Sequence, residues 1–185
     1  MTITTRRATL AAILLFVIVA LILWAMGRPP ICTCGEVTFW GRVGPTQSQM
    51  LADWYSPSHF IHGLIFYAVL RLVAKRQSIE RRFLMALVIE AAWEIMENTP
   101  LIIDRYREAT MALGYSGDSM LNSLSDIAMT GLGFLAARRL PVWASIGLAV
   151  GFELLTLAII RDNLTLNIWM LLIPTDAIRL WQGGA

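Results

Sequence analysis

The sequence predicts an all-α integral membrane protein: a single domain, residues 1–185, with about five transmembrane helices and an interfacial C-terminal helix. Hydrophobic residues make up 57% of the chain and charged residues only 15%, whereas soluble domains average roughly 45–50% and 25%. The apolar residues also form runs near the 20 or so residues that cross a bilayer. These observations exclude a soluble enzyme, a disordered chain and a disulfide-stapled miniprotein. The net charge of +2 gives no reason to expect nucleic acid as a partner.

The first span is expected at residues 8–26, which carry no charge. It is interpreted as a retained anchor, because Gly27-Arg28-Pro29-Pro30 is not the small-residue site that signal peptidase cleaves. An external loop over 27–57 precedes four further spans at about 58–74, 83–98, 118–137 and 141–160. The tail, 161–185, is broken by Pro174 and is expected to lie in the interface. Small residues that would let these helices approach closely are Gly131, Gly133, Ala136, Gly147 and Gly151.

The positions of Lys and Arg predict the orientation of the chain, because cytoplasmic segments of membrane proteins are enriched in both. With the N-terminus in the cytoplasm and the C-terminus outside, nine of the fifteen Lys and Arg residues lie in short cytoplasmic segments: Arg6, Arg7, Arg71, Lys75, Arg76, Arg81, Arg82, Arg138 and Arg139. The sequence therefore predicts a multi-pass membrane protein, with the lipid bilayer as its first partner.

Ionisable residues within the spans indicate where a functional site would lie, because they are costly in lipid and face the interior of a helix bundle. His59 and His62 are three residues apart and share one helix face. Acidic and amide groups are spaced along the third and fourth spans: Glu94, Glu97, Asp118 and Asn122 fall toward the outer face of the bilayer, and Glu90 and Asp126 near its midplane. This shared depth predicts one polar cavity that opens to the external side.

Imidazoles and carboxylates together can hold a divalent metal ion, relay protons or act as general acid and base. We expect His59, His62, Glu94 and Asp118 to form a metal site for zinc or iron. Catalytic roles are expected for Glu94, Glu97, Asp118 and Asp126, and substrate contacts for Asn122, Arg105 and Arg161, whose guanidinium groups would hold an anionic head group. The substrate would be envelope-linked or lipid-linked.

Two other functions remain open, and with them the question whether the protein is an enzyme at all. The polar residues could instead join the helices by hydrogen bonds, in an accessory or assembly subunit of a larger membrane complex. Proton or ion transport is favoured less, because the inner half of the bundle offers few polar groups besides Arg71.

Cys32 and Cys34 form a Cys-Thr-Cys sequence in the predicted external loop. That compartment is oxidising, and three states remain open for the two residues. They could form a redox-active disulfide, bind a soft metal such as Cu(I) or Zn, or stay as two unpaired thiols.

Five blocks of sequence, in order, resemble an uncharacterised family of bacterial inner-membrane proteins of unknown function, of the class catalogued as UPF or domain-of-unknown-function families. The blocks are GRPPICTCG, DWYSPSHFIHG, EAAWEIMENTP, RYREATMALGYSGDSMLNSLSD and RDNLTLN. This resemblance implies a location but no activity. A helix bearing His, then Glu, then Asp118-x-x-x-Asn122 and a glycine-rich helix is more remotely similar to VanZ-like membrane proteins, and no catalytic role is carried over from them.

Overall fold

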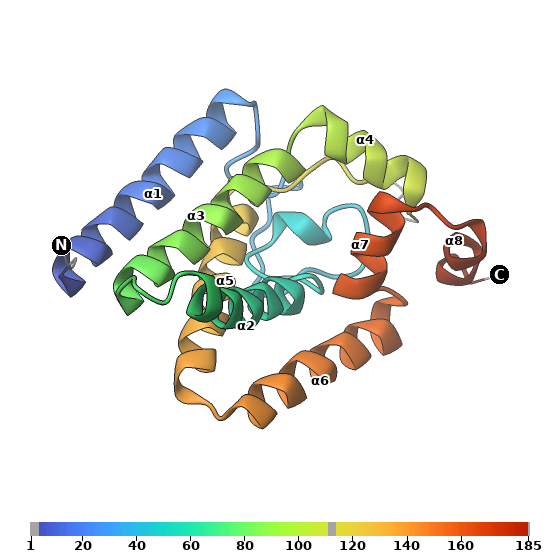
Figure 1. The fold of residues 1–185 in the computed structure, drawn as a ribbon. Coiled ribbons are helices and arrows are strands. Elements are labelled where there is room, and N and C mark those ends of the chain that lie inside the picture. The colour runs from blue at the N-terminus through green and yellow to red at the C-terminus, as the bar shows by residue number, and fades with distance from the viewer. Residues whose placement is uncertain (1–3, 111–113, 185) are drawn as a thin grey trace.

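The computed structural model describes residues 4–110 and 114–184 and is all-α, as the sequence predicts. The helices that match the five predicted spans are α1 (Thr5–Ala25), α2 (Ser56–Val73), α3 (Ile79–Glu97), α5 (Met120–Arg139) and α6 (Val142–Ile160). The shorter elements are a 3-10 turn η1 (Gln47–Gln49), α4 (Pro100–Ala109), α7 (Leu164–Leu172) and α8 (Asp176–Gln182). Figure 1 shows α1 and α3 at one side of the molecule and α4, α7 and α8 at the other.

Local signals fix several helix ends. The side chains of Thr4, Ser78, Ser119 and Asn163 each accept a hydrogen bond from a backbone N–H in the first turn of the helix that follows, which satisfies a donor that the helix itself leaves free. Helix α6 ends at Arg161, whose φ of 54° is left-handed. Pro174 lies between α7 and α8, so the tail forms two short helices rather than one. Helix α4 was not among the predicted elements.

Within residues 4–110 and 114–184, three helices are long and apolar enough to cross a membrane: α1, α5 and α6. These apolar helices indicate that the chain associates with a membrane. Helices α2 and α3 are of similar length but are not among the three. Their His and Glu residues lower their hydropathy, and those side chains point into the bundle.

Helices α2 and α5 make the closest contact in the bundle, through Gly63 and Gly133. A Cβ added at Gly133 would collide with the carbonyl group of Phe60, and one added at Gly63 would collide with the carbonyl oxygen of Thr130. Gly131 makes ordinary contacts, and no described atom lies within 4 Å of a Cβ built at Gly147 or Gly151. The expectation of close contacts is therefore wrong for these two, because they lie on an exposed face of α6.

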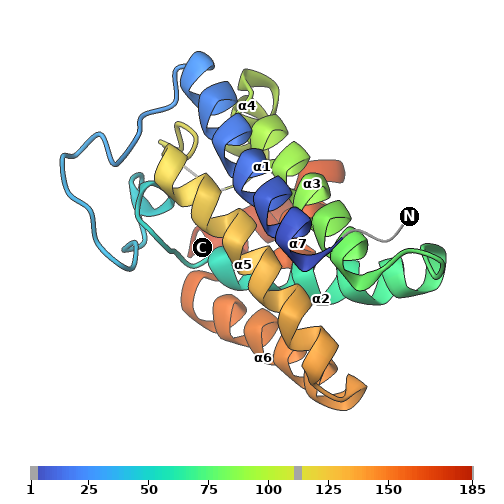
Figure 2. The same cartoon turned by 90° about the vertical axis from the view of Figure 1, so that its left-hand side faces the viewer.

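The apolar core lies where α1 and α3 pack against α5. Its buried members are Val19, Leu23, Leu87, Ala91 and Ile127. A smaller cluster, formed by Leu70, Ala86 and Phe134, joins α2, α3 and α5 further along the bundle. Figure 2 shows α1, α3 and α5 running side by side, with α6 set apart from α1. This packing leaves the polar faces of α2, α3 and α5 turned toward one shared space.

Candidate functional site: an acidic cavity with two histidines

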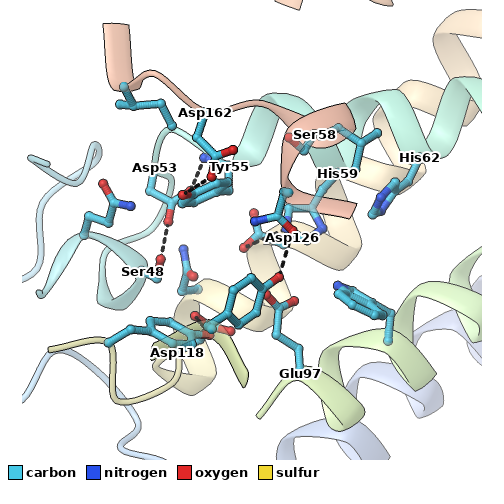
Figure 3. A pocket seen from close by; sticks show the side chains of 18 of the residues that line it. Ser48, Asp53, Tyr55, Ser58, His59, His62, Glu97, Asp118, Asp126 and Asp162 are labelled. Carbon is cyan, nitrogen blue, oxygen red and sulfur yellow. Dashed lines mark hydrogen bonds and ion pairs between the residues drawn. The ribbon is translucent and has the colours of Figure 1, made fainter. Parts of the chain in front are cut away.

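A cavity of about 540 Å³ is lined by residues of α2, α3, α5, the η1 loop and the segment from Ile160 to Ile168. Figure 3 shows several of the acidic and imidazole side chains meeting in it. Two histidines and six carboxyl groups line it: His59, His62, Asp53, Glu90, Glu97, Asp118, Asp126 and Asp162. No Lys or Arg of the described residues is in the lining. Four of the sequence-predicted acidic residues, Glu90, Glu97, Asp118 and Asp126, therefore converge in the lining, whereas Glu94 is not part of it. The cavity has a large excess of acidic groups over basic ones.

His59 and His62 both turn a ring nitrogen to the carboxylate of Glu90. Nδ1 of His59 lies 2.6 Å from Oε1 of Glu90, and Nδ1 of His62 lies 3.0 Å from each Glu90 oxygen. Glu90 is fully buried. A carboxylate in this position orients imidazole rings and leaves the other ring nitrogen free to act as a ligand or base.

Glu94 is one turn further along α3 and lies beneath the same histidine. Its side chain is 1% exposed, and neither carboxylate oxygen has a hydrogen-bond partner among the described residues. Oε1 is 3.4 Å from Nδ1 of His59. Buried polar groups are nearly always hydrogen-bonded, so Glu94 needs either a proton or a cation that the protein atoms do not supply.

Two groups of side chains have the mutual spacing of metal ligands, and they share His59. One group is His59, His62 and Glu90, and the other is His59, Glu94 and Glu97, with the ligand atoms of each group within 4.8 Å of one another. Asp118, which the sequence placed in the metal set, belongs to neither group among the described residues. Glu90 takes its place beside the histidines.

Asp118 is held instead by Asn98, the residue that caps the C-terminal end of α3. Asn98 Nδ2 donates to Asp118 Oδ2 at 3.0 Å, and the backbone N–H of Asp118 donates to Asn98 Oδ1 at 2.9 Å. The hydroxyl of Tyr115 donates to Asp118 Oδ1 at 3.0 Å. Burial and the nearby Asp53 raise the pKa of Asp118, which precedes α5, to about 7, against the effect of these hydrogen bonds. Asn122 donates to the carbonyl oxygen of Met50 and also lines the cavity.

Asp126 belongs to a hydrogen-bonded chain that sequence reasoning missed. Ser56 Oγ donates to Asp126 Oδ1 at 3.0 Å and accepts from the backbone N–H of Asp53 at 3.0 Å. Ser48 Oγ donates to Asp53 Oδ2 at 2.7 Å. On its other side, Asp126 Oδ2 lies 3.9 Å from Nε2 of His59. Asp53 Oδ1 accepts hydrogen bonds from the backbone N–H groups of Tyr55 and Ser56. The signal in the sequence was an aspartate shortly before Pro57, which lies in the first turn of α2.

Tyr55 and Asp162 close the end of the cavity where α6 meets α7. The Tyr55 hydroxyl donates to Asp162 Oδ2 at 2.9 Å. Burial raises the pKa of Asp162 to about 6, although hydrogen bonds from Tyr55 and from the backbone of Asn163 oppose the rise. Burial and the nearby Asp162 raise the pKa of Tyr55, which therefore keeps its proton.

The two arginines predicted to bind substrate do not line the cavity. Arg105 Nε donates to the carbonyl oxygen of Leu171 at 2.9 Å, and an Arg161 terminal nitrogen donates to the carbonyl oxygen of Trp181 at 3.0 Å. The first contact joins α4 to α7, and the second joins the end of α6 to α8. Cys32 and Cys34 form a disulfide, also outside the lining.

A family model described as a protein of unknown function (DUF2585) matches residues 23–184. The chain is 55% identical over 181 residues to a UPF0314 protein of Sphingopyxis alaskensis, covering 97% of this chain and 96% of the relative. It is 53% identical over 184 residues to a UPF0314 protein of Paracoccus denitrificans, covering 97% and 95%. No solved structure matches the chain. The remote likeness to VanZ-like proteins stays a prediction.

Proposed function

We propose that this chain, which belongs to the DUF2585 family, is a multi-pass membrane protein whose acidic cavity binds a divalent metal ion. The ion would serve chemistry on an amphiphilic substrate of the cell envelope. Five helices of 18 to 21 residues support the multi-pass arrangement. The basic cluster around Arg76 and Arg81 supports a cytoplasmic location for the turn between α2 and α3.

The observation that carries the proposal is the state of Glu94. A buried carboxylate without hydrogen bonds is expensive to maintain, and here it faces His59 at 3.4 Å and shares a ligand-like group with Glu97. A divalent cation in this group would satisfy Glu94 and reduce the repulsion among the carboxyl groups around it. Imidazole with carboxylates suits zinc, iron or manganese.

The surrounding residues supply the other parts of a catalytic site. Glu90 holds the rings of His59 and His62, so these imidazoles would keep one orientation when an ion binds. Asp126 is fixed by Ser56 and lies 3.9 Å from His59 Nε2, where it can accept or return a proton. A bound divalent ion polarises a carbonyl oxygen, or lowers the pKa of a water molecule.

Metal analysis of the purified protein tests this proposal. The wild type, His59→Ala, Glu94→Gln and Glu108→Gln are purified without chelator, dialysed against zinc, iron(II) or manganese, and assayed by inductively coupled plasma mass spectrometry. Glu108 is exposed on α4, so its variant controls for loss of a carboxylate elsewhere. We expect about one ion per chain in the wild type and Glu108→Gln, and a marked loss in the other two. Equal metal content in all four proteins would contradict the proposal.

Proton transfer is a second candidate, favoured by the direct contacts that join His62, Glu90 and His59. Carboxylate and imidazole chains of this kind relay protons in pumps. Proteoliposomes carrying a pH-sensitive dye distinguish the two functions. Transfer would give a proton flux that Glu90→Gln abolishes, whereas a metal site alone gives none.

A further inference from the structure

The cavity has an apolar end as well as an acidic one. Ile65 on α2, Ile89 on α3 and Ile168 on α7 all line it, yet they remain 46%, 44% and 47% exposed. Side chains that belong both to a cavity wall and to the outer surface mark the place where that cavity opens. Phe66 and Trp93 continue the apolar wall inward from this mouth.

The mouth lies part-way along the helices rather than at their ends. Ile65 is in the middle of α2 (Ser56–Val73), and Ile89 is in the middle of α3 (Ile79–Glu97). In a bundle that spans a bilayer, an exposed side chain at mid-helix lies at the depth of the acyl chains. The mouth would therefore open sideways into lipid. A second, polar end reaches Gly44, Gln47 and Ser48 in the loop before α2.

The charge of the lining limits the head group that the acidic end can accept. Six carboxyl groups and no Lys or Arg of the described residues line the cavity, so no basic side chain there can pair with an anionic head group. An anionic group such as a phosphate would be repelled, since charges interact strongly where water is scarce. Carboxylates accept hydrogen bonds, so they favour a head group that donates them.

We propose that this cavity binds an amphiphile whose aliphatic chain passes out between Ile65, Ile89 and Ile168 into the bilayer. Its head group donates hydrogen bonds, through hydroxyls or an amine, and carries no negative charge. The inference rests on the proposed function for treating the cavity as a substrate site. A volume of about 540 Å³ is within the range of ligand pockets, roughly 300–1,000 Å³, and suits one head group and the first part of one chain. This proposal reverses the expectation that Arg105 or Arg161 holds an anionic head group.

Photo-crosslinking in detergent micelles tests the chain path and the head group together. The probe is a dodecylamine with a diazirine in its chain, and the crosslinked peptides are identified by mass spectrometry. Competitors with the same chain are dodecylamine, dodecyl glucoside and dodecyl phosphate. We expect crosslinks on the peptides that hold Ile65, Ile89 and Ile168, and at least tenfold weaker competition by the phosphate. The amine and glucoside arms show whether positive charge or hydroxyl donation dominates. Phosphate competing as well as both others, or crosslinks confined to other peptides, would overturn the inference.

A pair of matched variants tests the mouth itself. Ile168→Trp narrows the opening, whereas Leu132→Trp places the same side chain at an exposed position on α5, outside the lining. Labelling of the cavity peptides should fall at least fivefold in the first variant and stay unchanged in the second. Equal labelling in both variants would contradict the proposed route of the chain.

The crosslinking is repeated after treatment with EDTA. Head-group selectivity that persists without metal supports this inference even if the metal proposal fails. If the protein binds metal but shows no head-group selectivity, this inference is rejected while the metal proposal stands.

Discussion

Nδ1 of His59 lies 2.6 Å from Oε1 of Glu90, which is on the neighbouring helix and whose side chain has no exposed surface. Nδ1 of His59 also lies 3.4 Å from Oε1 of Glu94, and Nε2 faces Asp126 at 3.9 Å. His62 turns its own Nδ1 to the same carboxylate. One glutamate therefore sets the orientation of both rings in the cavity.

Replacing Glu90 with Gln should weaken metal binding without removing a ligand of the His59, Glu94 and Glu97 group. The amide keeps the shape of the side chain but loses the charge and one acceptor for the two imidazoles. Loss of such an orienting partner lowers metal affinity by roughly 10–100-fold. Zinc titration by isothermal calorimetry measures the change, with Glu108→Gln as the control. An unchanged Kd would show that Glu90 does not orient the rings for binding.

Replacing Gly133 with Ala should destabilise the bundle. The added Cβ would meet the Phe60 carbonyl group on α2, and the helices would have to separate at their closest contact. Overpacking of this kind costs about 1–3 kcal/mol. Gly147→Ala is the matched control, because no described atom lies within 4 Å of its Cβ position. Thermal unfolding in detergent should show a lower midpoint for Gly133→Ala only, and equal midpoints would argue against this packing.

Asp162 should make stability depend on pH. Its pKa in the folded chain, about 6, lies above the ordinary value of 3.8, so the folded state binds more protons than the unfolded state between these values. Stability from this group is therefore greatest at low pH and falls as the pH rises from about 4 to about 6. In Asp162→Asn the amide cannot titrate. Unfolding midpoints at pH 4.5 and 7.5 should differ less in this variant than in the wild type, whereas an identical difference would exclude the effect.

The sequence predicted the membrane-type all-α fold and its five long helices, because apolar runs are local signals. The five sequence blocks also identified the family, which the matches confirm. Helix α4 escaped notice because its polar residues, such as Asp104 and Arg107, resemble a solvated loop. Its signal was Thr99-Pro100, a proline in the first turn of a helix. The spacing of Gly147 and Gly151 wrongly predicted a close helix contact, because helical spacing does not distinguish a face that contacts another helix from an exposed one.

The acidic residues of the site were also readable, because polar groups in spans face inward. Their pairing was not. From the sequence alone, Glu90 and Asp118 are both acidic residues of predicted spans, and nothing distinguishes them. In the structure, the crossing of α2 and α3 puts Glu90 beside the histidines, whereas Asn98 holds Asp118. Such pairings depend on helix crossings and loop paths, which periodicity does not contain. Asp53 and Ser56 were missed because they lie before the predicted span at 58–74 rather than within it.

X-ray absorption spectroscopy of the zinc-loaded protein tests the central claim most directly, because it reads the ligand atoms themselves. We predict a first shell of nitrogen and oxygen at about 2.0–2.2 Å, with imidazole scattering that disappears in His59→Ala and a reduced oxygen count in Glu94→Gln. A shell containing sulfur at about 2.3 Å, or one that neither substitution alters, would contradict a metal site built on His59 and Glu94.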